Sequence, residues 1–297
     1  MSKKPRVCVV GSINMDMVTT TKKMPDQGET VLGETFEMYP GGKGANQAIA
    51  AARLGANVSM IGAVGQDDFG HSLLSHFESE GVNREGIKII PGASTGIATI
   101  ILSENDNRII VSSGANAELT PAMVERVSDQ LLDSDIILLQ FEVPMEVVRF
   151  TVDFASKHKI PVIVNPAPFQ SMPEDILIKA TYFTPNEIEL LSMTDLPLFD
   201  SIKNKMIVTK GEQGVQYTSV YGEQVTIPAY QVQVVDTTGA GDTFNGALAT
   251  ELARTNSITE SITFANAAAA LSIGRLGAQG GMPRRSDVDK FMSYKPH

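Results

Sequence analysis

Short runs of apolar residues alternate with segments of helical periodicity along most of the chain. The run at residues 6–10 predicts a first buried strand, an Ala-rich segment at 44–54 predicts a helix, and residues 58–64 predict the next strand. Further helices are predicted at residues 69–80, 121–132, 145–156, 240–253 and 258–273. Further strands are predicted at residues 136–140 and 161–165, with an antiparallel pair at 213–218 and 224–227. Such alternation favours a parallel sheet covered by helices.

Two stretches interrupt this alternation. Residues 16–38 and residues 95–112 each contain two extended runs separated by turn-forming residues. The pattern allows two readings: one small β-sheet outside the main domain, or two separate surface hairpins. The pattern alone does not choose between them.

Composition and charge narrow the class of protein. The chain has 297 residues, of which 42% are hydrophobic and 20% charged, as expected for a folded soluble protein. Its one cysteine, Cys8, cannot form an internal disulfide and fits a reducing cytoplasm. No apolar run approaches the ~20 residues of a membrane span. The net charge of −10, without a long basic run, argues against nucleic-acid and anionic-membrane binding.

Several familiar catalytic patterns are absent or out of context. Residues 92–96 match the letters of a G-x-S-x-G nucleophile elbow, but a strand pattern follows where that motif needs a helix. The four histidines lack metal-ligand spacing. No G-x-G-x-x-G pattern occurs, and the Gly-Lys pair at 42–43 lacks the P-loop context. A serine hydrolase, a histidine metal centre and a dinucleotide dehydrogenase are therefore disfavoured.

The stretch at residues 234–246, VVDTTGAGDTFNG, carries the most chemistry. A small-residue turn at 239–241 lets consecutive backbone N–H groups converge at the start of a helix, and Asp242 follows in the first turn. Phosphoryl transfer needs this pairing of an anion-binding turn with a carboxylate that deprotonates a hydroxyl. The alternative is that Asp242 only caps a helix after a Gly-rich turn.

This stretch and two others resemble the signature segments of the ribokinase-like carbohydrate kinase family. The other two are PGGKGANQA at residues 40–48 and VGSINMDM at residues 10–17. The resemblance implies one doubly wound α/β domain over residues 1–297, with a small β-sheet lid formed by about 16–38 and 95–112. It also implies ATP-dependent phosphorylation of D-ribose at the 5-hydroxyl to give ribose 5-phosphate.

The resemblance also implies roles for single residues. Asp242 matches the family's catalytic base, and Gly239, Ala240 and Gly241 match its anion hole. The positions that match sugar-binding residues are Asn14, Asp16, Gly42, Lys43, Asn46 and Glu142. Lys43 could equally be a solvated surface lysine.

Further matches concern the nucleotide and two metal ions. Asn186 and Glu189 match a segment linked to Mg²⁺ and phosphate through water, and Asn186 could also simply cap a helix. The positions that match nucleotide-binding residues are Thr209, Gly211, Gly214 and Asn266. The positions that match ligands of an activating monovalent cation, K⁺, are Asp236, Thr238, Ser272, Arg275, Gly277 and Gly281. Some relatives carry serine where this chain has Gly281.

Other functions stay open at this stage. The acceptor could be 2-deoxyribose, fructose or a nucleoside such as adenosine, because no residue separates these sugars. A non-catalytic sugar-binding protein on the same fold is a further alternative, although Asp242 and the Gly-rich turn speak against it. The resemblance also implies a homodimer formed through the lid, because lid strands with exposed edges often pair between subunits in this family.

Overall fold

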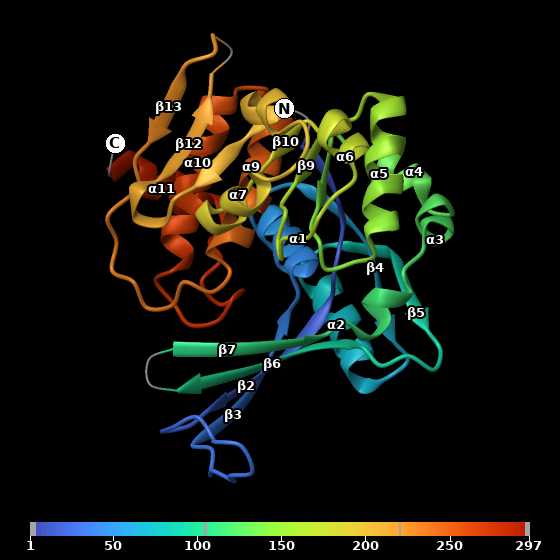
Figure 1. Cartoon of the computed structure of the whole chain (residues 1–297), viewed down its shortest axis with the longest axis vertical. Coiled ribbons are helices and arrows are strands. Elements are labelled where there is room, and N and C mark those ends of the chain that lie inside the picture. Colours follow the sequence, from blue (N-terminus) through green and yellow to red (C-terminus); the bar gives the residue numbers. More distant parts are fainter. Residues whose placement is uncertain (1–3, 104–105, 220, 295–297) are drawn as a thin grey trace.

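The central sheet of the computed structural model, which describes residues 4–103, 106–219 and 221–294, is parallel, with strand order β10-β9-β8-β1-β4-β5 (Figure 1). Its strands are β1 Arg6–Val10, β4 Asn57–Gly65, β5 Asn83–Ile90, β8 Ile136–Leu139, β9 Val162–Val164 and β10 Tyr182–Phe183. The chain leaves β1 toward β4 on one side and returns to β8 on the other. The direction in which successive strands are added to the sheet therefore reverses beside β1. In sheets of this kind, ligands bind at such a reversal point, beside the carboxyl ends of the strands.

Helices cover both faces of this sheet. Val7 and Val9 point into an apolar cluster with α1, α2, α9, α10 and α11, whereas Cys8 and Val10 point into another with α3 to α6. Alternate residues of a strand face opposite sides, so β1 is buried twice. The helices are α1 Lys43–Arg53, α2 Asp68–Ser79, α3 Pro121–Glu125, α4 Ser128–Leu132, α5 Met145–His158, α6 Glu174–Lys179, α7 Glu187–Met193, α8 Phe199–Ile202, α9 Ala240–Thr255, α10 Ile258–Ser272 and α11 Arg285–Tyr294. The predicted doubly wound α/β class is confirmed.

Helices α1 and α9 pack unusually closely. A Cβ atom at Gly246 of α9 would lie 2.7 Å from Ala50 Cβ and 2.7 Å from the carbonyl oxygen of Gln47, both in α1. No side chain larger than hydrogen fits there. The glycine therefore sets the separation of the two helices that carry most of the polar cluster described below.

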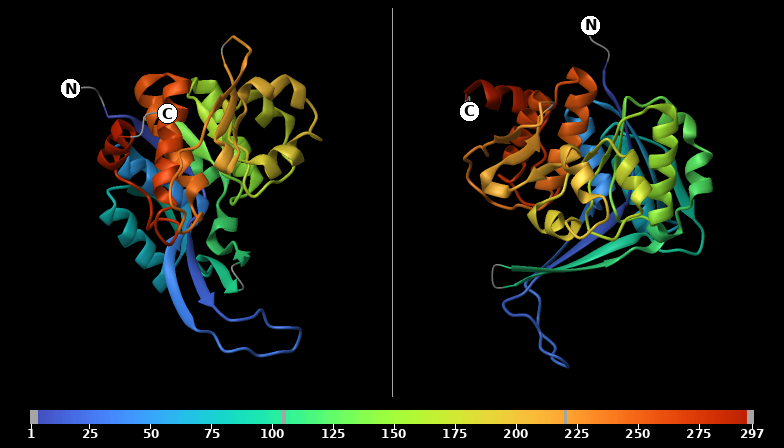
Figure 2. Two further views of the ribbon diagram at one scale, coloured as in Figure 1. Left: turned by 90° about the vertical axis from the view of Figure 1, so that its left-hand side faces the viewer. Right: turned by 45° about the horizontal axis from the view of Figure 1, so that its top comes forward.

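The two stretches that interrupt the β-α pattern form one four-stranded sheet, which we call the lid sheet. Its order is β3-β2-β6-β7, with β2 Asn14–Thr20, β3 Thr35–Gly41, β6 Gly96–Ser103 and β7 Asp106–Ser112. The two hairpins are antiparallel, and β2 joins them by pairing in parallel with β6. Figure 2 shows this sheet projecting from the main body. The reading as two separate hairpins is therefore wrong.

A third sheet, antiparallel, lies beyond β10. It consists of β11 Ile207–Thr209, β12 Val215–Thr218 and β13 Gln224–Ile227, so the predicted antiparallel pair is confirmed with a later start for β12. Single parallel bridges from Phe183 to Met206 and from Asn186 to Thr209 align β11 with the end of the central sheet. Short 3₁₀ turns occupy Gly114–Glu118, Lys203–Lys205 and Gly211–Gln213.

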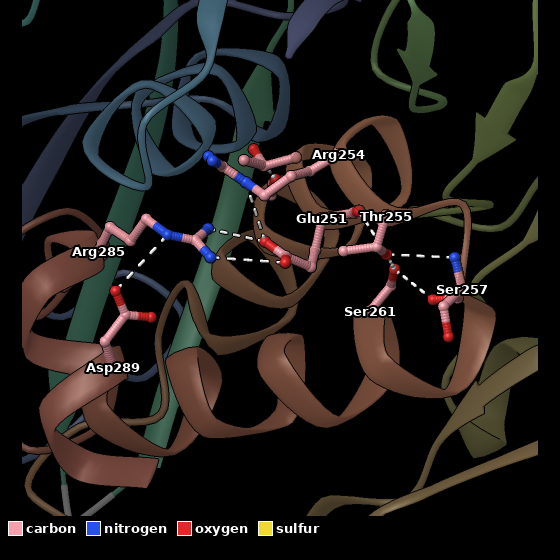
Figure 3. Close-up of polar contacts among 9 residues, drawn as sticks. Glu251, Arg254, Thr255, Ser257, Ser261, Arg285 and Asp289 are labelled. Carbon is pink, nitrogen blue, oxygen red and sulfur yellow. Dashed lines mark hydrogen bonds and ion pairs between the residues drawn. The ribbon is translucent and has the colours of Figure 1, made fainter. Parts of the chain in front are cut away.

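The C-terminal helix is tied to α9 by a buried carboxylate. Glu251 is only 6% exposed, and its Oε2 lies 2.7 Å from Nη1 of Arg285 and 3.5 Å from Nε of Arg254 (Figure 3). The guanidinium of Arg285 also lies 4.7 Å from the ring centre of Phe264 in α10. A buried ionised carboxylate needs such partners. The contacts therefore fix α11 against α9 and α10.

Some elements differ from the sequence-based expectation. The predicted continuous helix at 121–132 is wrong: it breaks into α3 and α4 at Val127, whose φ of −119° is not helical. Strand β5 and helix α11 were not predicted. Within the described residues, no helix combines the length and apolar character needed to cross a membrane.

Candidate active site

Asp242 lies at the centre of a polar cluster between the amino ends of α1 and α9. Its side chain is 8% exposed. Oδ2 accepts a hydrogen bond of 2.9 Å from Nδ2 of Asn46, and Oδ1 accepts one of 3.0 Å from Nε2 of Gln47. Burial raises the pKa of Asp242, and the nearby Lys43 ammonium and the two amide donors offset this only in part. A raised pKa moves a carboxylate toward the range useful for proton transfer near neutral pH.

Asp16, on β2, lies against the backbone at the end of β3. A Cβ atom at Gly41 would collide with the carboxyl group of Asp16, so a larger residue there would displace this carboxyl group from its place. Burial, reinforced by the charges of Glu142 and Asp242 and opposed by Lys43, raises the pKa of Asp16 to about 7. Carboxyl groups with such strongly shifted pKa values are common at binding and catalytic sites.

Lys43 begins α1 after the turn at Gly42, which has a φ of +90°. Its backbone N–H donates to Oε2 of Glu142 over 3.1 Å, and Oγ of Ser12 donates to the same oxygen over 2.5 Å. Burial would lower the pKa of the Lys43 ammonium, but the surrounding carboxylates outweigh this and raise it. A solvated surface lysine would not have these surroundings.

Asn14 is buried at the start of β2, where the lid sheet begins. Its Oδ1 accepts a hydrogen bond of 2.8 Å from Nδ2 of Asn116, and Asn116 also bonds the backbone of Ile13 through both ends of its amide. This network fixes the position of Asn14 where β1 leads into the lid. The structure thus brings together the predicted sugar-binding residues Asn14, Asp16, Gly42, Lys43, Asn46 and Glu142 beside Asp242.

A cavity of about 670 Å³ opens beside the third sheet and is lined by Ala240 and Gly241, which directly precede Asp242. The four residues that the sequence predicts to bind the nucleotide, Thr209, Gly211, Gly214 and Asn266, all line this cavity. Asn266 donates from Nδ2 to the carbonyl oxygen of Pro228 over 2.6 Å. This bond fixes an extended segment that forms another wall of the cavity. The further lining residues include Tyr230, Gln231, Val232, Val234, Phe244, Ala269, Ala270 and Ile273.

The turn at 239–241 joins the cavity to the polar cluster. Gly239 has a φ of +78°, and a Cβ atom there would lie 2.8 Å from Cα of Ala278. Apart from its chain neighbours and the adjoining backbone of α9, no atom of the described residues lies within 4 Å of a Cβ built on Gly241. Ala240 and Gly241 both line the cavity. Space above Gly241 is therefore left for a ligand rather than filled by the protein.

Asn186 and Glu189 form a capping box at the start of α7. The backbone N–H of Asn186 donates to Oε2 of Glu189 over 2.9 Å, and the N–H of Glu189 donates to Oδ1 of Asn186 over 2.8 Å. The capping role of Asn186 is thus present. Asn186 also lines the cavity. Burial raises the pKa of Glu189, partly opposed by its bond to Asn186 and by Lys43.

The residues expected to bind a monovalent cation lie on two adjoining loops. The N–H of Val235 donates to the carbonyl of Ile273 over 2.8 Å, and Oδ2 of Asp236 accepts 2.8 Å from the N–H of Gly277. Oδ1 of Asp236 accepts 2.9 Å from the N–H of Thr238. Burial would raise the pKa of Asp236, but these hydrogen bonds lower it overall, so the carboxylate is ionised.

The remaining positions of these two loops differ in surroundings. Ser272 is buried, and Arg275 is exposed. A Cβ atom at Gly281 would collide with the carbonyl oxygen of Ser272. The serine that some relatives carry there would not fit this backbone, so glycine suits the chain's own geometry.

Sequence reasoning missed several residues of the cluster. Gln47 follows Asn46 in the same motif, and its adjacency was a usable signal. Ser12 likewise lies inside a quoted motif. Asn116 and Gln279 carried no local signal, because each comes from a loop that reaches the cluster only through the tertiary fold.

Comparison with known proteins finds the same arrangement of segments elsewhere. Residues 4–285 match the pfkB family carbohydrate kinases. The chain is 44% identical over 291 residues to a ribokinase of Bacillus subtilis (97% of this chain, 99% of that protein) and 46% identical over 289 residues to a ribokinase of Lactococcus lactis (95% of each). The structure of Arabidopsis thaliana ribokinase complexed with ribose and ATP matches with a TM-score of 0.91 at 29% identity, covering 99% of this chain and 100% of that one. Since the match spans every segment that builds the cluster and the cavity, the chain belongs to the pfkB family of carbohydrate kinases.

Proposed function

We propose that this protein phosphorylates D-ribose at the 5-hydroxyl with ATP, giving ribose 5-phosphate and ADP. One observation carries the proposal: Asp242, a buried carboxylate with both oxygens held by amides, belongs to a polar cluster and directly follows Ala240 and Gly241, which line a cavity of about 670 Å³. The polar cluster suits the hydroxyl groups of a pentose, and the cavity suits a nucleotide. Relatives named ribokinases, one of them complexed with ribose and ATP, support this choice.

The sugar is held by groups that accept and donate hydrogen bonds. Asp16 and Glu142 accept from sugar hydroxyls, and a carboxylate can take two adjacent hydroxyls at once. Asn14, Lys43 and Asn46 supply donors around them. The positive φ of Gly42 brings the backbone itself toward the ligand.

Asp242 acts as the general base. It accepts the proton of the 5-hydroxyl while the hydroxyl oxygen forms a bond to the γ-phosphorus of ATP. The bond from that phosphorus to the β,γ-bridging oxygen breaks, and ADP leaves. The N–H groups of Gly239, Ala240 and Gly241, at the amino end of α9, stabilise the charge on the transferred phosphoryl group.

ATP occupies the cavity, with Thr209, Gly211 and Gly214 on one wall and Asn266 on another. Asn186 and Glu189 would hold Mg²⁺ through water, since carboxylate and amide oxygens are ligands that this ion accepts while keeping several waters. The bound ion would neutralise charge on the phosphates.

A monovalent cation would be held by the ionised Asp236, by Thr238 and by backbone carbonyls from Ser272, Arg275, Gly277 and Gly281. A carboxylate combined with carbonyl oxygens is a suitable donor set, and bound there the cation would fix the turn at 239–241 without touching the sugar. Activity should rise severalfold when Na⁺ is replaced by K⁺ at constant ionic strength, and Asp236→Ala should abolish the response. Equal rates in K⁺-free Na⁺ and in K⁺ would contradict this site and leave the kinase assignment intact.

The lid sheet closes over the sugar and excludes water, in one domain that spans residues 1–297. Two copies of the chain pair through the lid as a homodimer. The protein works in the cytoplasm, where ATP is available and Cys8 stays reduced.

A coupled assay of ADP release with D-ribose, 2-deoxyribose, fructose and adenosine tests the proposal. We expect the highest kcat/KM with D-ribose, and NMR of the product should place the phosphate at C5. A clear preference for another acceptor would replace ribose by that compound. Sugar binding without any ADP release would instead indicate a non-catalytic sugar-binding protein.

A further inference from the structure

A chain of side-chain amides leads from the 272–281 loop to the base. Nε2 of Gln279 donates to Oδ1 of Asn46 over 2.9 Å, and Nδ2 of Asn46 donates to Oδ2 of Asp242 over 2.9 Å. Gln279 is 7% exposed and Asn46 is 6% exposed. Water is therefore largely kept from these bonds, and their geometry is set by the protein.

The direction of every bond in this chain is fixed. An ionised carboxylate only accepts, so Asn46 must turn its NH₂ group toward Asp242 and its oxygen toward Gln279. Gln279 supplies the donor that this oxygen needs. Its own Oε1 lies 2.7 Å from Nε2 of His76 on α2, which can donate to it. Without Gln279, the Asn46 amide could rotate and present its oxygen to the carboxylate.

The backbone of Gln279 is held as firmly as its side chain. Nη1 of Arg53, at the end of α1, donates to the Gln279 carbonyl oxygen over 2.5 Å, while Nη2 and Nε of Arg53 pair with Glu80, which directly follows α2. The residue therefore keeps a fixed place relative to α1, the helix that carries Asn46.

We propose that Gln279 is a positioning residue for the base: it holds Asn46 in the orientation that donates to Asp242 and so keeps this carboxylate ionised and aimed at the acceptor hydroxyl. This inference rests on the proposed function and adds a residue to the machinery of that reaction. Gln279 touches neither the sugar nor the nucleotide in this role.

Two substitutions test the role, with K⁺ in excess throughout. Gln279→Met keeps the size but removes the donor, and Gln279→Glu offers Asn46 an acceptor that favours the wrong orientation. Because the Asn46 amide is no longer held in place, its hydrogen bond to the charged Asp242 is weakened, and the acidic limb of the pH profile of kcat/KM for the sugar should move up by about one pH unit in the methionine variant. In the glutamate variant, the acidic limb should move up further. The KM for ATP should stay within about twofold of wild type.

The charged groups that face Asp242 are unchanged in both variants: Lys43 of α1, Asp16 of β2, Glu142 after β8 and Glu189 of α7. Gln224→Met, on the exposed face of β13, is the matched control and should leave the profile unmoved. The methionine variant adds no charge, so a shift in it cannot come from a new Coulomb interaction.

Thermal unfolding checks that each variant is folded. If the glutamate variant does not fold, the methionine variant alone is enough to test the positioning role. An unmoved acidic limb in a folded Gln279→Met protein, whatever its activity, would overturn the positioning role. Absence of ADP release by the wild type with every acceptor would instead overturn the proposed function, and this inference with it.

Discussion

Asp242 is a buried carboxylate, and each of its two oxygens accepts a hydrogen bond from a side-chain amide. Asp242→Asn should lower kcat by about 10²–10⁴ because a general base is removed. The KM for ATP should change little, since the cavity walls are untouched. Steady-state kinetics with both substrates varied would measure these values.

The substitution Asp242→Asn should also lower the free energy of unfolding. The NH₂ group of an asparagine at 242 would face the NH₂ group of either Asn46 or Gln47, so one donor would lose its acceptor. Near-wild-type kcat in the folded variant would show that Asp242 is not the base.

Replacing Asp16 should change both the KM for ribose and the pH dependence of the free energy of unfolding. Asp16→Ala should raise the KM for ribose at least ~10-fold, because sugar hydroxyls lose their acceptor in a closed site. The folded-state pKa of about 7 exceeds the ordinary value of 3.8, so folded wild type holds the proton more tightly than the unfolded chain. The stability of the ligand-free wild type relative to Asp16→Ala should therefore fall as pH rises from about 4 to about 7, and then level off.

Urea unfolding of both proteins at several pH values measures this difference, whose upper limit is about 4 kcal/mol. A difference that does not vary with pH would mean that the carboxyl group is not buried in its neutral form. Equal damage to the KM values of ribose and ATP would indicate that Asp16 supports the lid or the fold instead.

At the scale of single residues, the sequence predicted what lies inside contiguous motifs. Asn46 and Asp242 are 196 positions apart, yet each sits in a recognisable segment, and the structure joins them by a hydrogen bond. Gln279 could not be found in this way, because its role depends on which loop packs against α1. Local pattern carries no information about such contacts.

Helix α11 shows how one element depends on a single buried pair. Arg285→Ala would remove the strongest partner of the buried Glu251 carboxylate and the contact with Phe264. Because it leaves a buried charge poorly compensated, the substitution should lower the free energy of unfolding by about 3 kcal/mol. Equilibrium denaturation measures this value, and kcat at 25 °C should be unchanged.

A second variant separates charge from packing. Combining Arg285→Met with Glu251→Gln removes both charges and should recover a large part of the lost stability. If Arg285→Ala were as stable as wild type, the pair in Figure 3 would contribute nothing to docking α11.

Element prediction succeeded where periodicity was long and uninterrupted. Strand β1 and helix α9 begin at the predicted residues because a buried apolar run and a Gly-rich turn mark them. Strand β5 was missed, since charged residues occupy its first half and only its pairing with β4 makes it a strand. The break between α3 and α4 likewise has no proline or glycine to mark it.

For the whole molecule, the lid sheet leaves apolar side chains exposed on both of its faces. Ile110 of β7 is 65% exposed, and neighbours on the same sheet are exposed as well. The other exposed apolar residues of this sheet are Phe36, Met38, Tyr39, Leu102, Ile109 and Val111. Surfaces of this kind commonly mark protein–protein contacts, and two lids could cover each other's.

Ile110→Asp should therefore convert a dimer into a monomer in sedimentation velocity experiments, and the KM for ribose should rise because the lid closes less firmly. Ile178→Asp is the matched control, since Ile178 is 60% exposed on α6, away from the lid sheet. A wild type that is monomeric at micromolar concentration, or an Ile110→Asp protein that remains dimeric, would exclude the lid as the dimer interface.

The close crossing of α1 and α9 at Gly246 has a consequence for protein engineering. Programmes that seek thermostability routinely replace glycine by alanine inside helices, because alanine favours the helix by about 1 kcal/mol. At this position the added methyl group would force the helices apart and carry Gln47 away from Asp242. The strain of this overpacking should outweigh the gain in helix propensity, so residue 246 should be left out of any stabilised library.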